Sequence, residues 1–190
     1  MNTLENVKFE IKTVENAPEA SKSILAAAKK TYGFKPNLLG LMANHPALLN
    51  TYWEGDNFLT KNSVLTAKER QVAFLSASYE NNCHYCMAAH SGIAQMNQVS
   101  QEVIDALRSG ADLPDTKLNE LSKYVKATTV KRGRVSEKDV QNFLDAGYTQ
   151  EAILEVITII GLKVFTNYIN YLAKTPVDSA FQVNIWSKNN

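Results

Sequence analysis

The feature that most constrains this fold is a long apolar segment near the end of the chain. A helix over residues 151–172 would be hydrophobic on more than one face. Its apolar residues include Ile153, Leu154, Val156, Ile157, Ile159, Ile160, Leu162, Val164 and Phe165. A helix that is hydrophobic all round must be covered all round. We therefore expect it to be both the central helix of the domain and part of an interface between subunits, because a chain of 190 residues has few other ways to bury it.

Charge and composition limit the cellular location and the classes of partner that we expect for this chain. Glu155 and Lys163 interrupt the stretch "AILEVITIIGLKVF", so we expect it to be too short and too charged to span a membrane. The start of the chain, "MNTLENVKFEIK", lacks the apolar core of a signal peptide. The formal net charge is +1 with no large basic block, which argues against a nucleic-acid or membrane partner. The expected location is the cytoplasm, where structural disulfides are rare.

Helical patterns fill most of the chain, and no pairing of strands is evident. Pro18 and Gly33 mark the start and stop of one helix, and Thr66 followed by Glu69 predicts a capping box. Helices are predicted over residues 18–33, 36–45, 46–61, 65–81, 83–97, 100–110, 116–133, 136–147 and 149–175. The sequence thus predicts an all-α domain with short loops. We divide it into an N-terminal arm (1–17), one helical domain (18–181) and a C-terminal tail (182–190).

Both cysteines and two of the three histidines lie in one segment, "ENNCHYCMAAHSG", residues 80–92. Positions three and four apart share one face of a helix, so Cys83, Cys86 and His90 are predicted to form a line. Asn81 and Asn82 are good N-cap residues, which would place Cys83 in the first turn, where the helix dipole favours a thiolate. Two thiols at this spacing can close a disulfide once one is oxidised. His90 could take a proton from Cys86 or stabilise its anion.

Two other interpretations of this segment stay open at this point. A C-x-x-C pair is often half of a zinc site, and Cys83, Cys86, His90 and Glu80 are four candidate ligands. The chain has no other cysteine, and three ligands on successive turns of one helix would strain a tetrahedron. Alternatively, both cysteines are small apolar residues of the core. The cluster of two thiols with a histidine favours redox chemistry over both.

The segment "LTAKERQVAFLSASYENNCHYCMAAHSG" resembles the alkyl hydroperoxidase D-like (AhpD-like) family of the carboxymuconolactone decarboxylase superfamily. Its C-x-x-C-x-x-x-H motif falls on Cys83, Cys86 and His90. "FKPNLLGLMANHPALL" upstream and "LAKTPVDSAF" near the end are similar to the peroxidase-related branch of that family. The resemblance covers about residues 18 to 181. It implies a compact multi-helix bundle that assembles into trimers or hexamers.

The resemblance also implies roles for the site residues. Cys86 would attack the peroxide, Cys83 would resolve the product to a disulfide, and His90 would relay protons with a glutamate. The dipole argument alone favours Cys83 as the more acidic thiol, whereas proximity to His90 favours Cys86, and we follow the family. The family's glutamate position holds Gln71, which carries no titratable proton at neutral pH. We expect Glu80 to substitute for it, because it lies three residues before Cys83.

A second departure from the family is Tyr85, at a position where some members have a histidine. Its hydroxyl could donate a hydrogen bond to substrate, or the ring could simply pack.

The sequence therefore predicts a cytoplasmic thiol-dependent peroxidase and disulfide oxidoreductase of antioxidant type. The expected partners are a hydroperoxide, a dithiol donor such as a lipoyl group or a thioredoxin-like protein, and further copies of the chain. No metal and no organic cofactor is expected. Two alternatives are a lactone decarboxylase, as elsewhere in the superfamily, and a non-enzymatic redox-sensing module. The paired thiols argue against the first, because decarboxylation of a lactone does not need them.

Overall fold

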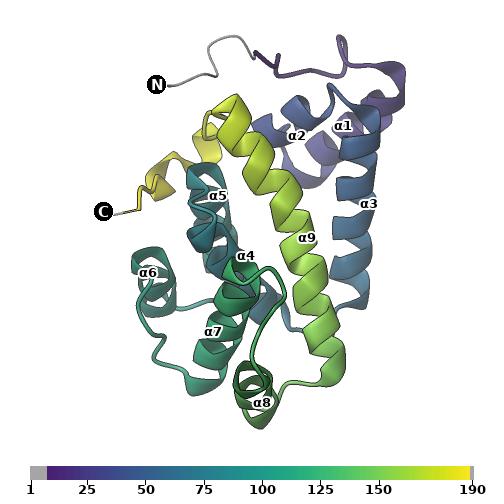
Figure 1. Ribbon diagram of the computed structural model, residues 1–190. Helices are drawn as coiled ribbons and strands as arrows, with labels where there is room; N and C mark the ends of the chain where they lie inside the picture. Colours follow the sequence, from purple (N-terminus) through teal and green to yellow (C-terminus); the bar gives the residue numbers. More distant parts are fainter. Residues whose placement is uncertain (1–7, 189–190) are drawn as a thin grey trace, which may run out of the picture.

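The computed structural model describes residues 8–188, and within that range the protein is built of nine α-helices and one 3-10 helix, with no strand (Figure 1). The elements are α1 (Glu19–Tyr32), α2 (Asn37–Met42), α3 (Pro46–Asn62), α4 (Ala67–Glu80), α5 (His84–Met96), α6 (Gln101–Ser109), α7 (Thr116–Val130), α8 (Glu137–Asp145), α9 (Gln150–Ala173) and η1 (Ser179–Asn184). The predicted all-α fold is confirmed.

The predicted start and stop signals act as expected. The Thr66 hydroxyl accepts a hydrogen bond from the Glu69 N–H, and the Glu69 carboxylate accepts from the Thr66 N–H, which completes the capping box of α4. Gly33 ends α1 in the left-handed region, with φ of 78°. Lys174, also left-handed, ends α9 just before Pro176. Local sequence therefore sets most of the helix boundaries.

α9 is the central helix, because it packs against α2, α3, α4, α5 and α7 (Figure 1). Its buried face combines apolar residues such as Val156 and Ile159 with the polar side chains of Lys163 and Asn167. With 24 residues it is, by length and composition alone, long and apolar enough to cross a membrane, so the expectation that the segment is too short and too charged was wrong. The buried polar contacts of α9 with its neighbours identify it as a core helix of this fold.

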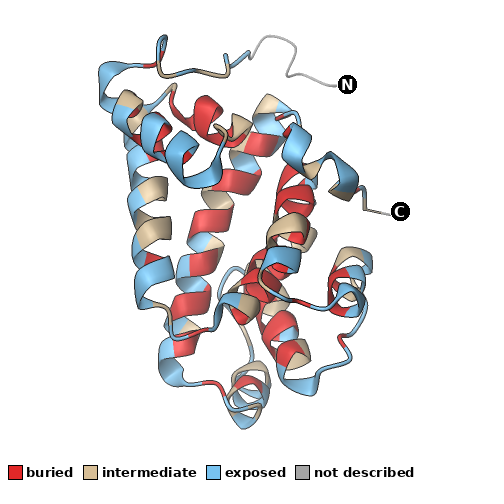
Figure 2. Ribbon diagram, turned by 180° about the vertical axis from the view of Figure 1, so that it is seen from behind, coloured by how far each residue is buried: buried red, intermediate tan, exposed pale blue. Residues whose placement is uncertain are grey.

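The buried hydrophobic residues form two clusters, and Phe165 of α9 packs against both. Figure 2 shows where the buried residues lie on the helices. The larger cluster contains residues from each of the helices α4, α5, α6, α7, α8 and α9, and it includes Trp186 near the end of the chain. The smaller cluster joins α1, α2 and α3 to the first turn of α5, and both cysteines belong to it. The thiols thus lie inside the packed core of the protein.

Both ends of the described chain pack on the helices. In the N-terminal arm, the Lys12 N–H donates to the Gly40 carbonyl over 3.0 Å. Residues 1–7 of that predicted arm lie outside the described residues. In the predicted tail, the indole of Trp186 is 7% exposed, and its Nε1 donates to the Arg108 carbonyl over 2.7 Å. The predicted boundary at residue 181 falls inside η1, and Asn184, Ile185 and Trp186 beyond it are hydrogen-bonded to Arg108 of α6, while residues 189–190 lie outside the described residues.

Candidate functional site

A tight connection between α4 and α5 sets the position of the two thiols. Asn81 is the C-cap of α4, and Asn82 adopts the left-handed conformation, with φ of 50°. Cys83 follows as the N-cap of α5, and its Sγ accepts a hydrogen bond from the Cys86 N–H over 3.4 Å. The prediction that an asparagine caps this helix was wrong, because Cys83 itself takes that position. Cys86 therefore occupies the first turn, where the dipole argument had placed Cys83.

Cys86 lies in a buried pocket of hydrogen-bond donors. Its side chain is 2% exposed, and its Sγ accepts from Asn167 Nδ2 at 3.1 Å and from Asn170 Nδ2 at 3.3 Å. Burial alone would raise the pKa of Cys86. The hydrogen bond from the Cys83 thiol, the ammonium of Lys163, the Thr166 hydroxyl and the Asn170 amide outweigh burial and lower this pKa to about 6. Cys86 is therefore the more acidic thiol of the pair.

Cys83 has the opposite character. The hydrogen bond that its thiol donates to Cys86, together with its burial, raises the pKa of Cys83 far above the ordinary value for a thiol. Both cysteines are unmodified thiols in this structure. With the pKa of Cys86 lowered and that of Cys83 raised, Cys86 is the thiol that ionises first and Cys83 is the one that keeps its proton. This geometry favours the assignment of Cys86 as the nucleophile over the dipole argument for Cys83.

His90 lies between an amide and an ammonium. Its Nδ1 is 2.9 Å from the Gln71 Oε1, and its Nε2 is 2.5 Å from the Lys163 Nζ. An amide oxygen only accepts, so Nδ1 carries the ring proton and Nε2 accepts from Lys163. Burial and the neighbouring ammonium hold the pKa of His90 well below its usual value. His90 is therefore neutral, and Gln71, at the position where the resemblance implies a glutamate, fixes its tautomer.

Lys163, Asn167 and Asn170 of α9 are polar residues of the site that the sequence interpretation missed, and Lys163 is the charged one. Its side chain is 1% exposed, and its Nζ lies 4.6 Å from the centre of the Phe74 ring. No carboxylate within residues 8–188 forms an ion pair with it. Lys163, Asn167 and Asn170 follow each other at spacings of four and three on α9, so they form one polar stripe in an otherwise apolar helix. That stripe was the sequence signal for this half of the site.

Glu80 is not brought into this arrangement. It lies at the C-terminal end of α4, and no hydrogen bond or ion pair in the described part of the chain joins it to Cys83, Cys86 or His90. The charge that it faces is Lys126 on α7. Its predicted part in the proton relay therefore has no support from the geometry, and His90 has Lys163 as its charged neighbour.

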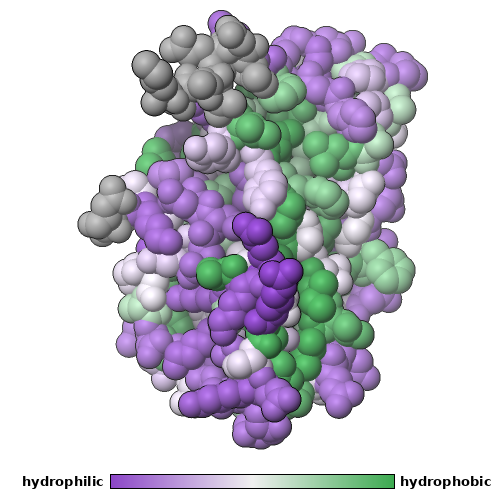
Figure 3. All heavy atoms as spheres, in the orientation of Figure 1, coloured by the Kyte–Doolittle hydropathy of each residue, from purple (hydrophilic) through white to green (hydrophobic). Residues whose placement is uncertain are grey.

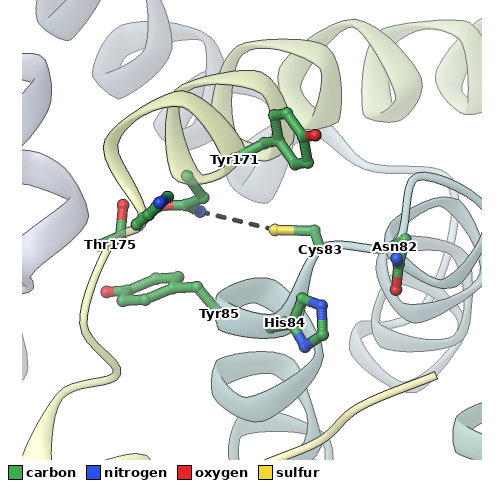
Figure 4. A pocket seen from close by; sticks show the side chains of 8 residues that line it. Asn82, Cys83, His84, Tyr85, Tyr171 and Thr175 are labelled. Carbon is green, nitrogen blue, oxygen red and sulfur yellow. Dashed lines mark hydrogen bonds between the residues drawn. The ribbon is translucent and has the colours of Figure 1, made fainter. Parts of the chain in front are cut away.

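A cavity of about 360 Å³ opens beside Cys83 (Figure 4). Tyr171 of α9 lies on one side, Tyr85 and His84 of α5 lie on the other, and the Cys83 sulfur points into the space between them (Figure 4). The lining residues are Asn82, Cys83, His84, Tyr85, Asn170, Tyr171, Lys174 and Thr175. Cys86 is not one of them. The cavity is thus reached by the sulfur of Cys83, with that of Cys86 behind it.

The hydroxyl of Tyr85 is used inside the fold. It donates to Asp178 Oδ2 at 2.5 Å, and Asp178 Oδ1 accepts from the Asn37 N–H at 3.0 Å. Burial and the nearby carboxylate raise the pKa of Tyr85, so the phenol keeps its proton. Of the two roles considered for Tyr85, this contact favours the structural one, because it ties α5 to the segment after α9 and to the start of α2.

The groups around the two thiols bear on the zinc alternative. Within residues 8–188, no group of three or more histidine, cysteine, aspartate or glutamate side chains is arranged to hold a metal ion. The neighbours of the Cys86 sulfur are amide N–H donors, which stabilise an anion and cannot ligate a cation.

Comparisons with known proteins agree on the fold. Residues 45–127 match the model of the carboxymuconolactone decarboxylase family. A structure described as the alkylhydroperoxidase AhpD core, an uncharacterized peroxidase-related protein from Ralstonia eutropha JMP134, is 20% identical, with a TM-score of 0.82 over 92% of this chain and 93% of that one. An uncharacterized peroxidase-related protein from Silicibacter sp. TM1040 is 18% identical, with a TM-score of 0.78 over 92% of each chain.

A third similar structure is a cysteine-to-alanine variant of the debrominase Bmp8 in complex with 2,3,4-tribromopyrrole. It is 16% identical, with a TM-score of 0.78 over 95% of this chain and 96% of that one. No curated protein matches the sequence. At these identities, the similarity to solved structures establishes the fold alone.

Proposed function

We propose that this chain, whose residues 45–127 match the carboxymuconolactone decarboxylase family model and whose fold is similar to that of an AhpD core structure, is an AhpD-like thiol-dependent peroxidase and disulfide oxidoreductase of antioxidant type. The observation that carries the proposal is the Cys86 sulfur, which receives two amide N–H groups and lies beside the Lys163 ammonium and the Cys83 thiol. A nucleophilic thiolate and a second thiol to resolve its product are what peroxide reduction requires.

The first half-reaction oxidises the thiol pair. The Cys86 thiolate attacks the terminal oxygen of a hydroperoxide, the O–O bond breaks, and its electron pair leaves with the inner oxygen as an alkoxide that takes a proton. Cys86 becomes a sulfenic acid. The Cys83 sulfur, as it loses its proton, attacks the Cys86 sulfur, and hydroxide leaves and is protonated to water. The net result is one disulfide, one alcohol and one water for each hydroperoxide.

The second half-reaction restores the thiols. A dithiol donor attacks the disulfide, and a mixed disulfide forms and is then resolved by the second thiol of the donor. Cys83 lines the cavity and Cys86 does not, so Cys83 is the sulfur that a donor meets first. Cys86 leaves as the better-stabilised thiolate, because a thiol of lower pKa is the better leaving group.

Proton transfer is assigned to His90 and Lys163. The neutral Nε2 of His90 and the ammonium of Lys163 are 2.5 Å apart, so they share a proton beside the thiol pair. Gln71 orients the ring and carries no titratable proton. We propose that Lys163 takes the part that the family gives to a glutamate, in place of the predicted Glu80.

The test is turnover of cumene hydroperoxide with dihydrolipoamide as the donor. Cys86→Ser is expected to abolish turnover and sulfenic acid formation, whereas Cys83→Ser should consume one equivalent of hydroperoxide, form a trappable sulfenic acid, and then stop. Sulfenic acid at residue 86 would be detected by dimedone labelling and mass spectrometry. Sustained turnover by Cys86→Ser would contradict the proposal.

Assembly into homo-oligomers remains part of the proposal. Phe58, Val64 and Leu154 are each more than half exposed, and they line a hollow of about 700 Å³ where α3 and α9 meet. Figure 3 shows hydrophobic residues gathered along α9 on this side of the molecule. A trimer or hexamer of this chain would cover that face, as expected for a helix that is apolar on several faces.

We also propose a cytoplasmic location.

A second candidate function is reductive removal of bromide from a halogenated heteroaromatic ring. The similar debrominase structure holds 2,3,4-tribromopyrrole, and in this chain the cavity beside Cys83 has aromatic walls from Tyr85 and Tyr171. Two thiols would supply the two electrons and become a disulfide, while the ring gains hydrogen and bromide leaves. Bromide release from 2,3,4-tribromopyrrole with a dithiol donor, lost in Cys83→Ser, would favour this function over peroxide reduction.

The two alternatives from the sequence are separated by other experiments. A Cys83→Ser/Cys86→Ser double variant that still converts a carboxylated lactone would indicate a decarboxylase. A disulfide that forms with peroxide but never turns over with any donor would indicate a redox sensor.

A further inference from the structure

Two oxygen atoms beside the thiols have no partner. In residues 8–188, three buried side-chain oxygens lack a hydrogen bond, namely Tyr148 Oη, Asn170 Oδ1 and Thr175 Oγ1. Asn170 and Thr175 are 6% and 8% exposed, and both line the cavity beside Cys83. Buried polar groups in folded proteins are almost always paired, so two unpaired oxygens in one cavity indicate a place for a ligand.

The Asn170 amide connects the thiols to this cavity. Its Nδ2 is 3.3 Å from the Cys86 Sγ and 3.7 Å from the Cys83 Sγ, so this end of the amide belongs to the sulfur pair. Its Oδ1, on the other side of the same planar group, is the unpaired atom. A ligand group bound to Oδ1 is therefore held one amide away from the nucleophile.

The unpaired atoms define the ligand group. Asn170 Oδ1 only accepts, so the ligand must present an O–H or N–H donor to it, and the Thr175 hydroxyl can both donate and accept. An O–O–H group fits both atoms, because its terminal O–H donates to Asn170 and its inner oxygen accepts from Thr175. The cavity of about 360 Å³ holds far more than hydrogen peroxide, and Tyr85 and Tyr171 give it aromatic walls (Figure 4).

We infer that Asn170 Oδ1 and Thr175 Oγ1 form a recognition site for the O–O–H group of an organic hydroperoxide with an apolar body. The inference rests on the proposed peroxidase function and adds the residues that orient its substrate. The terminal oxygen held by Asn170 lies at the Cys83 end of the thiol pair, so it must move past the Cys83 sulfur before the Cys86 sulfur attacks it and the O–O bond breaks. The electron pair passes to the inner oxygen at Thr175, and this oxygen takes a proton from water to give the alcohol.

Asn167 provides a matched control for Asn170. Its Nδ2 also donates to the Cys86 sulfur, at 3.1 Å, but its Oδ1 is paired with Asn81 Nδ2 at 2.8 Å and it does not line the cavity. Asn167 thus stabilises the thiolate without reaching the ligand. Replacing either asparagine by leucine should lower the reactivity of Cys86, and only the Asn170 replacement should also remove ligand recognition.

The first experiment measures binding without turnover. The reduced protein is alkylated with iodoacetamide in the presence of cumyl alcohol, the product of cumene hydroperoxide, or of cumyl methyl ether, which lacks the O–H donor. The alcohol should slow alkylation of Cys86, the thiolate of the pair, at about tenfold lower concentration than the ether, which is the value of about one hydrogen bond. Asn170→Leu should remove this difference and Asn167→Leu should keep it. Equal protection by alcohol and ether in the wild type would overturn the inference.

The second experiment uses Thr175→Val, which keeps the side-chain shape and removes the hydroxyl. We expect the KM for cumene hydroperoxide to rise about tenfold, while the pH profile of Cys86 alkylation stays as in the wild type. An unchanged KM would overturn the role of Thr175, and a shifted profile would indicate a structural effect. Wild-type turnover with no preference for the alcohol refutes this recognition site and leaves the peroxidase intact. If the wild type prefers the alcohol to the ether but does not turn over hydroperoxide, the result supports a binding site for an O–H group and refutes the peroxidase.

Discussion

Replacing Lys163 by methionine tests the electrostatic half of the site. The side chain keeps nearly the same length and loses its ammonium, which lies 2.5 Å from the His90 Nε2 and lowers the pKa of Cys86. Lys163 is 1% exposed and forms no ion pair within the described residues, so its charge acts on the thiols and His90, and also on the buried Asp56 carboxylate. The thiolate should therefore lose the cation that lowers its pKa and keep its amide donors.

The size of the effect follows from the pKa of Cys86. With a pKa of about 6, about half of Cys86 is thiolate at pH 6. Loss of a neighbouring opposite charge raises a pKa by about one to two units at such a site, which leaves about 1 to 9% thiolate at pH 6. Because only the thiolate reacts, the alkylation rate at pH 6 should fall about 5- to 50-fold. Above about pH 9, the two proteins should react at nearly the same rate.

The assay is the rate of iodoacetamide alkylation at Cys86 from pH 5 to pH 10, read by fragment-ion mass spectrometry because Cys83 shares its peptide. Lys174→Met is the matched control, since Lys174 is an exposed cation at the rim of the cavity. Its profile should coincide with that of the wild type. A Lys163→Met profile that also coincides with the wild type would refute the assignment of Lys163 as the cation that holds the thiolate.

Three further predictions concern stability and assembly. Tyr85→Phe should lower the free energy of unfolding by about 1 to 3 kcal/mol, because the buried Asp178 carboxylate loses a hydrogen-bond donor. The measurement is urea unfolding, and a change below about 0.5 kcal/mol, the usual size for a surface substitution, would contradict the prediction. The reduced protein should gain stability as pH rises from about 5 to 8, because the pKa values of Cys86 and His90 are lower in the folded protein and the unfolded chain therefore binds more protons. It should lose stability above about pH 8.5, because Cys83 then keeps its proton only in the folded protein. Thermal melts that show no pH dependence in this range would refute the assigned protonation states. Leu154→Lys, on the exposed face of α9, should shift sedimentation toward monomer; a wild type that is already monomeric at micromolar concentration would contradict the proposed oligomer.

The helices could be predicted from the sequence because their boundaries are local. Thr66 with Glu69, Pro18 and Gly33 fix the ends of their helices through contacts within a few residues. The C-x-x-C-x-x-x-H spacing likewise placed two thiols and a histidine together, since one helix carries them. The cap geometry was missed, because the left-handed conformation of Asn82 moves Cys83 to the N-cap position.

The other half of the site depends on tertiary packing. α9 brings Lys163 and Asn170 to residues that lie 73 to 87 positions earlier in the chain, a distance that no local pattern encodes. Their helical spacing was visible, yet Lys163 was interpreted only as an interruption of an apolar segment. Glu80 was chosen for its closeness in sequence, and it failed to reach the thiols because the end of α4 directs it toward Lys126 of α7.

The central claim is that Cys83 and Cys86 act as one redox couple. It is tested most directly by mass spectrometry of the reduced protein before and after one equivalent of cumene hydroperoxide, with iodoacetamide added to mark free thiols. The account predicts that both thiols disappear together and that the peptide holding them loses two hydrogen atoms, with full recovery after dithiol treatment. Two thiols that remain alkylatable, or one cysteine oxidised while the other stays free, would contradict it.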